Sequence, residues 1–311
     1  KFSKTYLQYP ADSDIGAWRS YFRWQGTVNA ADPANWAVSY MPTTVPAPDG
    51  EEYFAAALLL AHRRWGSDGA VNYLAEGQAV AAAMLHNQAS AMRFPIIHQM
   101  QNMVTFVPNG NSNGFSDPSY HLPGFYELYA RDGAAADAEK WRSVAETSRA
   151  FLVASANAAT GLHPDYANFT GVPNAGGNNQ EHDDFRFDAW RVVMNMAMDY
   201  AWFGQDLRMR AQVERYQEFF STRLTESNVM ASLFVVDGST PTGPNGGGGG
   251  STALTATLAA GSLASGHTAR PRFVTALWNV SQQQGQYRYY QEGVYLLGLL
   301  HAAGKFNHSW E

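Results

Sequence analysis

The stretch PAPDGEEYFAAALLLAHRRWG, Pro46–Gly66, passes from a polar segment rich in proline into a run of apolar residues. Apolar side chains recur in it every three or four residues, the spacing of one helix face: they are Phe54, Ala57, Leu58, Ala61 and Trp65. This pattern predicts an amphipathic helix over Gly50–Trp65, with one face turned toward a core. Similar periodicity recurs along the chain, so the sequence favours a helical fold.

The acidic residues ahead of this helix admit two interpretations. Asp49 and Glu52 have the three-residue spacing of a capping box, and Pro48 ahead of them favours an extended entry to the helix. One Asp side chain can also cap a helix and offer its second oxygen to a ligand, so both roles stay open for Asp49. We interpret Glu51 and Glu52 as partners of the helix dipole.

Helical periodicity occurs in ten segments, a short one at the N-terminus and nine longer ones. They are Lys1–Gln8, Gly50–Trp65, Val71–Gln88, Tyr120–Arg131, Ala136–Ala156, Phe187–Phe203, Met209–Leu224, Thr252–Ser265, Pro271–Gln282 and Tyr287–Ala303. Short strands are expected near Val104–Val107 and Leu233–Val236. Helices joined by loops, with no repeating strand pattern, predict an all-α fold of helix hairpins packed in a ring, as a single domain over 1–311. An (α/α)6 barrel of this kind needs about twelve helices, so we expect it to be incomplete at the N-terminus.

The charge of the chain bears on its partners. The net charge is −6 and the pI is about 5.8, whereas nucleic-acid binding relies on clustered Lys and Arg that neutralise phosphates. The apolar stretches fall short of the roughly 18 residues that a membrane span needs. We therefore expect neither nucleic acid nor a membrane as a partner. Aromatic residues make up 14 % of the chain, which suits a sugar-binding cleft as well as a large core.

The residue types exclude several kinds of chemistry. The chain has no Cys, which excludes disulfides and thiolate catalysis. Its 9 His show no metal-binding spacing such as HExxH, so we expect no metal site. Phosphate-binding loops of the GxxxxGK[ST] or GxGxxG type and a GxSxG nucleophile motif are missing too, and no cofactor is expected. The few Lys and many Asn, Gln and Gly slightly favour a secreted bacterial protein over a cytoplasmic one.

A second acidic cluster lies in EHDDFRFDAWRVV, 181–193. Asp188 stands between Phe187 and Trp190 at the start of an apolar helix, where burial can raise a carboxyl pKa. Arg191 follows three residues later, one helical turn away. An ordinary ion pair at this spacing is one interpretation, and a general base that an arginine keeps ionised and oriented is the other. Both stay open on the residues alone.

Three stretches interleave aromatic rings with polar groups. They are SYFRW (Ser20–Trp24), SDPSYHLPGFYELY (Ser116–Tyr129) and QYRYYQEGVY (Gln286–Tyr295). Most rings of this kind belong to cores. Trp24, Tyr120 and Tyr290 are the better candidates for a cleft, the two tyrosines because they lie at the starts of predicted helices.

Five segments, in this order and with this spacing, resemble glycoside hydrolase family 8. They are PAPDGEEYFAAAL, FSDPSYHLPGFYELYA, TGLHPDYANFTGVPN, FRFDAWRVVMNMAMDYAWFG and YYQEGVYLLGLL. The likeness is greatest to xylan-active members, the endo-xylanases and the reducing-end xylose-releasing exo-oligoxylanases. The resemblance implies an (α/α)6 barrel that hydrolyses β-1,4-linked xylan or xylo-oligosaccharides with inversion, by a general acid and a general base.

The resemblance also implies roles for single residues. Asp188 matches the general base and Arg191 the arginine beside it. Asp49 matches the aspartate that binds and distorts the sugar next to the scissile bond. Tyr120 and Tyr290 match two tyrosines that line that site. Trp24 matches an aromatic residue on which sugars stack.

Two departures from the family pattern carry expectations. The family's general acid is a glutamate in a segment resembling TEGMSY, which this sequence does not contain. We expect that the segment has been removed, that another chain or an N-terminal fragment supplies it to complete the barrel, or that the protein is a catalytically impaired xylan-binding protein. A truncated barrel would also expose the apolar faces that the missing helices cover, which favours self-association. The second departure is GPNGGGGGST, 243–252, where exo-acting members carry a Leu-His-Arg type of loop. Glycines cannot block a cleft firmly, which slightly favours an open, endo-type cleft.

Overall fold

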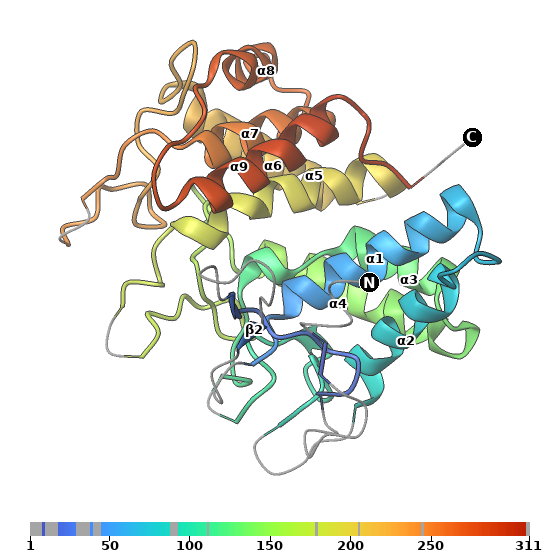
Figure 1. The fold of residues 1–311 in the computed structure, drawn as a ribbon. Coiled ribbons are helices and arrows are strands. Elements are labelled where there is room, and N and C mark those ends of the chain that lie inside the picture. The colour runs from blue at the N-terminus through green and yellow to red at the C-terminus, as the bar shows by residue number, and fades with distance from the viewer. Residues whose placement is uncertain are drawn as a thin grey trace. The chain divides into compact units, whose positions relative to one another are not determined.

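The computed structural model describes residues 8–9, 18–28, 38–39, 45–87, 93–110, 112–177, 180–204, 206–243 and 246–308. Nine α-helices lie in these ranges (Figure 1): α1 (Pro48–Trp65), α2 (Tyr73–His86), α3 (Pro123–Asp132), α4 (Ala138–Ala154), α5 (Val192–Phe203), α6 (Leu207–Ser221), α7 (Thr252–Ala260), α8 (Arg270–Asn279) and α9 (Arg288–Ala302). Short 3₁₀ helices are η3 (Pro118–Tyr120), η4 (Ala135–Asp137), η5 (Phe187–Arg191) and η6 (Gly261–Leu263). The nine longer predicted helices are thereby confirmed; the predicted stub Lys1–Gln8 lies outside the described residues except for Gln8.

Strands are few and short in the described part of the chain. β1 (Thr27–Val28) pairs with β2 (Val38–Ser39), and β3 (Ile97–His98) pairs with β4 (Met103–Val104), both antiparallel. The strand predicted near Val104–Val107 thus overlaps β4. The strand predicted over Leu233–Val236 is wrong, because only Phe234 forms a bridge there, with Phe185. Leu233 and the ring of Phe234 instead pack into the core of unit 2, defined below.

The described chain divides into two compact units. Unit 1 comprises residues 1–116 and 127–143, and unit 2 comprises 117–126 and 144–311. The prediction of a single domain stays a prediction. In unit 1, α1 packs along α2 (Figure 1), and a Cβ on Gly77 of α2 would lie 3.0 Å from Leu59 of α1. The absent side chain at Gly77 therefore allows the two helices to approach closely.

The start of α1 differs from the predicted capping box. The helix begins at Pro48, whose fixed φ suits the first helical position, and its N-cap is Ala47, which makes no side-chain cap hydrogen bond. Asp49 accordingly lies inside the first turn, half-buried, and the capping interpretation is wrong. Glu51 also lies in this turn, but it is buried and accepts a hydrogen bond from the Phe22 N–H at 2.6 Å. Burial raises the pKa of Glu51 well above its usual range.

Unit 2 is built around α7, every residue of which is buried. Helices α5, α8 and α9 pack against it (Figure 1), and α5 also packs against α6. The contact of α7 with α9 is close at one point, since a Cβ on Gly298 would lie 2.7 Å from the Ala256 Cβ. Rings of Phe185, Phe220 and Phe234 fill the side of this core near residues 185–191.

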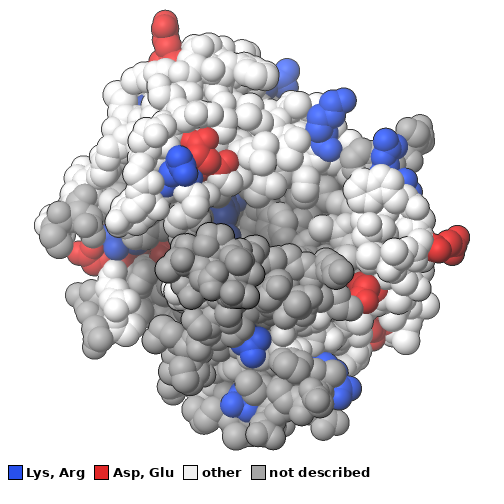
Figure 2. Space-filling view, in the orientation of Figure 1, with Lys and Arg blue, Asp and Glu red and all other residues white. Residues whose placement is uncertain are grey.

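Charged side chains of the described residues are scattered over the face shown in Figure 2, singly or in small groups among uncharged ones. None of the helices in the described ranges is both long and apolar enough to cross a membrane.

Candidate active site

Asp188 follows a residue with unusual backbone geometry in unit 2. Arg186 is extended at the N-cap of η5, with a φ of −156°, and Phe187 then has a φ of 33°. A positive φ crowds the Cβ of any residue other than glycine, so such residues are uncommon and are held by their surroundings. The predicted helix over Phe187–Phe203 therefore begins as this 3₁₀ turn and continues as α5.

The carboxylate of Asp188 forms an ion pair with Arg191, as the spacing predicted. Asp188 Oδ1 lies 2.9 Å from Arg191 Nη2, and the side chain of Asp188 remains 31 % exposed. The same nitrogen of Arg191 donates a hydrogen bond to Ser119 Oγ at 2.8 Å. The guanidinium lies 5.7 Å from the centre of the Tyr120 ring, a cation–π distance. Arg191 thus joins Asp188 to the segment that carries Tyr120.

Two buried carboxyls lie near this pair. Asp117 is fully buried; its Oδ1 accepts a hydrogen bond from the Ser119 N–H at 2.7 Å, and its Oδ2 has no hydrogen-bond partner in the described part of the chain. Asp165 is 1 % exposed, and its Oδ1 accepts a hydrogen bond from the Asp188 N–H at 3.0 Å.

Burial raises the pKa of both Asp117 and Asp165 well above the usual range, and the nearby charge of Asp188 raises it further. Arg191 acts in the opposite direction on both, without cancelling the effect of burial. The two buried carboxyls therefore tend to keep their protons, which limits the negative charge that gathers around Arg191.

The two predicted tyrosines also lie in unit 2. Tyr120 is buried at the end of η3. Tyr290 lies at the start of α9, and its hydroxyl donates a hydrogen bond to the Phe187 C=O at 2.9 Å. Its ring centre is 6.3 Å from that of Trp190. The structure thus brings together Asp188, Arg191, Tyr120 and Tyr290, four of the six predicted site residues.

A cavity of about 670 Å³ opens beside Asp188. Phe187, Tyr287 and Tyr289 line it with rings that are 44 %, 65 % and 80 % exposed. Exposed aromatic rings with a carboxylate at their edge give the cavity flat apolar walls and one charged group.

Gly250, at the end of the glycine run, lines the same cavity. The run is packed rather than loose, since the N–H groups of Ser232 and Leu233 donate hydrogen bonds to the Gly247 C=O at 3.2 and 3.0 Å. A Cβ on Gly250 would lie 2.9 Å from the backbone carbonyl oxygen of Val229. Close approach to the 228–233 segment therefore requires glycine here, and the cavity wall at Gly250 has no side chain.

The other two predicted site residues lie in unit 1. Trp24 presents a ring that is 62 % exposed, as a platform for a ligand requires. Asp49 lies in the first turn of α1, and its charge contributes to the raised pKa of Glu51. Their roles in sugar binding stay predictions.

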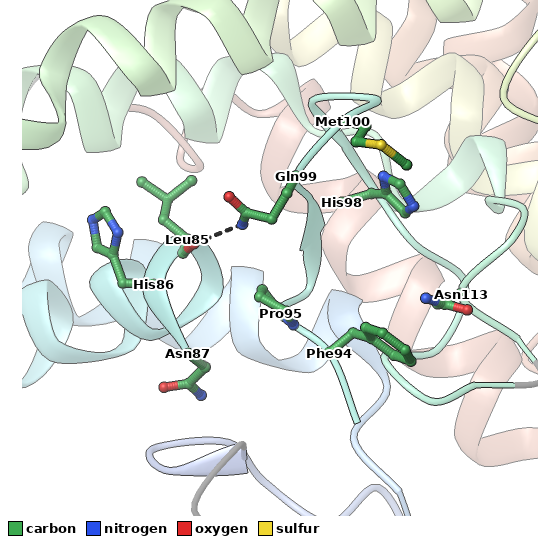
Figure 3. A pocket seen from close by; sticks show the side chains of 9 residues that line it. All are labelled: Leu85, His86, Asn87, Phe94, Pro95, His98, Gln99, Met100 and Asn113. Atoms are coloured by element: carbon green, nitrogen blue, oxygen red, sulfur yellow. Dashed lines mark hydrogen bonds between the residues drawn. The ribbon is translucent and has the colours of Figure 1, made fainter. Parts of the chain in front are cut away.

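Unit 1 has a cavity of its own, of about 480 Å³ (Figure 3). Leu85, His86 and Asn87 from the end of α2 line one side, and the Gln99 side chain donates a hydrogen bond to the Leu85 C=O at 2.9 Å. The lining includes no carboxylate, so this cavity lacks the group that a glycosidase base requires. The described residues also contain no cluster of three or more His, Asp or Glu suited to a metal ion.

Sequence reasoning missed Asp117 and Asp165. Both stand next to a proline, in short segments that also contain a His and a Tyr, SDPSYHLP and GLHPDY. A carboxyl in such a setting is a signal of burial that could have marked them as candidates.

Comparison with known proteins identifies the family. A sequence model of glycosyl hydrolases family 8 matches residues 28–304. A reducing-end xylose-releasing exo-oligoxylanase of Paenibacillus barcinonensis is 35% identical, over 98% of this chain and 75% of its own length. Endoglucanase A of Acetivibrio thermocellus is 30% identical, over 65% of this chain and 40% of its own length.

Solved structures agree with the sequence comparison. A GH8 xylobiose complex from Teredinibacter turnerae matches with a TM-score of 0.85 at 35% identity, over 98% of this chain and 75% of that one. A complex of the P. barcinonensis exo-oligoxylanase with xylose matches with a TM-score of 0.83 at 32% identity, over 99% of this chain and 76% of that one. The likeness confirms the predicted all-α fold class, that of the (α/α)6 barrel. With a family model spanning 28–304 and a relative 35% identical over nearly the whole sequence, the chain belongs to glycosyl hydrolase family 8.

Proposed function

We propose that this chain hydrolyses β-1,4-xylosidic bonds of xylo-oligosaccharides with inversion, and that Asp188 is the general base. The observation that carries the proposal is the position of Asp188, which lines the cavity of about 670 Å³, stays partly exposed and lies 2.9 Å from Arg191. A base must reach the water that attacks the sugar, and its negative charge must persist until the proton moves.

The Asp188 carboxylate has a cationic partner in Arg191. Arg191 stabilises that charge directly, and its second contact, with Ser119, fixes the direction of the guanidinium. Asp117 and Asp165 have raised pKa values because they are buried, so their protons keep the local charge low. In the proposed reaction, Asp188 accepts a proton from water as that water bonds to the anomeric carbon, on the face opposite the leaving oxygen.

Inversion also requires a general acid, with the two carboxyls about 6.5–9.5 Å apart. The family resemblance assigns this acid to a glutamate in a segment that this sequence does not contain. The proposal therefore concerns the base side of the reaction, with Asp49 and Trp24 as sugar-binding residues.

The substrate class is supported by the cavity and by the relatives. Exposed rings at Tyr287 and Tyr289 suit the flat faces of a sugar chain. The P. barcinonensis relative is named a reducing-end xylose-releasing exo-oligoxylanase. The structure of a catalytic mutant of a GH8 xylanase from T. turnerae has been solved in complex with xylohexaose. These likenesses favour hydrolysis over the alternative of a xylan-binding protein without catalysis.

The test is to incubate the protein with xylohexaose and follow the anomeric protons of the products by NMR. The proposal predicts that new reducing ends appear first as the α anomer, before mutarotation. Binding without products would favour the xylan-binding alternative, and products that appear first as the β anomer would contradict inversion. The sizes of the products distinguish endo from exo action, because an exo enzyme at first gives xylose and xylopentaose in equal amounts, whereas cleavage of internal bonds gives fragments of two to four units.

A further inference from the structure

We propose that Asp165 and Tyr290 are positioning residues that clamp the peptide group between Phe187 and Asp188, and so set the direction of the Asp188 carboxylate. This inference rests on the proposed role of Asp188 as the base. It gives Tyr290 a task other than contact with the sugar, and it assigns a role to Asp165, which the family resemblance did not single out.

The clamp consists of two hydrogen bonds to one peptide group. The N–H of Asp188 donates to Asp165 Oδ1 at 3.0 Å, and the C=O of Phe187 accepts from the Tyr290 hydroxyl at 2.9 Å. In a trans peptide the N–H and the C=O point in opposite directions. The peptide plane is therefore held from both sides, which restricts its rotation and hence the direction of the Cα–Cβ bond of Asp188.

Backbone strain explains why this peptide needs to be held. Phe187 has a φ of 33°, in the region that residues with a Cβ avoid. Without the two hydrogen bonds, rotation of the peptide would relieve that crowding and carry Asp188 away from its place beside the cavity. Residues strained in this way gather at functional sites, where surrounding contacts over-determine their geometry.

Asp165 is itself held in place by contacts with the 182–184 segment. Its Oδ2 lies 2.6 Å from His182 Nδ1, and the His182 ring stacks on Tyr166 with centres 4.0 Å apart. The N–H groups of Asp165 and Tyr166 donate to the C=O groups of Asp184 and His182 at 2.9 and 2.8 Å. The 182–184 segment thus supports both the carboxyl of Asp165 and the backbone that carries it. A rigid support of this kind is what the precise placement of a catalytic group requires.

Three variants test the clamp in the full chain. Tyr290→Phe removes the hydroxyl and keeps the ring, Asp165→Leu removes the acceptor and keeps the branching at Cγ, and Asp165→Asn keeps an acceptor oxygen for the Asp188 N–H. We expect kcat for xylohexaose to fall at least about tenfold in the first two, with Kd for the substrate nearly unchanged, because misplacement of a reacting group by about 1 Å can cost about 10²-fold. Asp165→Asn should recover much of that loss.

Asp199→Asn is the matched control. Asp199 is a buried carboxylate that forms two hydrogen bonds with Arg149, at 2.7 and 2.8 Å, further along α5. Its replacement should lower the stability of the protein and leave kcat of the folded fraction unchanged. A purely structural role for Asp165 and Tyr290 would give the same pattern as this control.

Amide hydrogen exchange of the peptide covering residues 185–193 gives a second readout, independent of activity. Exchange at the Asp188 amide should speed up in Asp165→Leu and in Tyr290→Phe, and much less in Asp165→Asn and Asp199→Asn. Unchanged kcat and unchanged exchange in Tyr290→Phe would overturn the clamp. If instead Asp188→Asn turns over normally, the proposed base is wrong, whereas the exchange data still decide whether the clamp exists.

Discussion

Acidification should destabilise the protein through His163, which anchors the segment that carries Asp165. His163 is fully buried, with Nδ1 at 2.8 Å from the Tyr216 hydroxyl and Nε2 at 2.7 Å from the Leu152 C=O. These contacts suit a neutral ring that donates from Nε2 to Leu152 and accepts at Nδ1 from Tyr216. Burial lowers the pKa of His163 from 6.5 to about 4.

The sign of the effect follows from the lowered pKa. Between about pH 6.5 and pH 4 the unfolded chain binds a proton at His163 and the folded chain does not, so protons favour unfolding in that range. The contribution of neutral His163 to the free energy of unfolding is fully present above pH 6.5 and is lost as the pH falls toward 4. A pH of 5 lies about 1.5 units below the ordinary histidine pKa of 6.5, and each unit corresponds to about 1.36 kcal/mol. At pH 5 the free energy of unfolding is therefore lower by about 2 kcal/mol.

The assay is urea unfolding of the wild type and of His163→Gln at pH 7 and pH 5. Gln can still donate a hydrogen bond to Leu152 but has no group that titrates in this range. Carboxyls with raised pKa values, such as Glu51, act with the opposite sign, but they are common to both proteins and cancel in the comparison. The free energy of unfolding of the wild type minus that of the variant should shrink by about 2 kcal/mol from pH 7 to pH 5. A difference that stays flat or grows would refute the assignment of a neutral, buried His163.

Two further predictions concern the site and the fold. Arg191→Met removes the charge that holds Asp188, so kcat for xylohexaose should fall by about 10²-fold. Arg191→Lys keeps the charge but loses the planar guanidinium with its several N–H donors, so it should lose less activity. Steady-state kinetics measure both variants, and activity equal to that of the wild type in both would contradict the role of the arginine. Gly298→Ala places a Cβ 2.7 Å from Ala256 Cβ, so α7 and α9 must separate. We expect the free energy of unfolding, measured with urea, to fall by about 1–3 kcal/mol. Gly293→Ala on the same helix, where a Cβ meets nothing within 4 Å, should cause no such loss.

The helices could be predicted because their periodicity is local. The apolar spacing that begins at Phe54 gave the extent of α1 to within two residues. The predicted capping box at Asp49 was wrong because the helix already begins at Pro48. Proline at the first helical position and Asp at the N-cap are both local signals for a helix start, and the sequence does not say which of them prevails. The ion pair of Asp188 with Arg191 was also local, since three residues separate them, and the structure confirms it.

The support of the site could not be predicted from spacing. Asp165 precedes Asp188 by 23 residues, and the two meet only through the tertiary fold. The same is true of the Tyr290 hydroxyl and the Phe187 carbonyl, 103 residues apart. The positive φ of Phe187 has no signature in the sequence, because aromatic residues do not prefer that region.

In the proposed reaction Asp188 removes the proton from the attacking water, and the variant Asp188→Asn examines this role by itself. The variant keeps the shape of the side chain and the backbone N–H that binds Asp165, but it cannot accept the proton. The measurement is of kcat and Kd for xylohexaose on the same variant. We expect kcat to fall by about 10²–10⁴-fold and Kd to stay within a few fold of the wild type. Turnover at the wild-type rate, with binding intact, would show that Asp188 is not the general base.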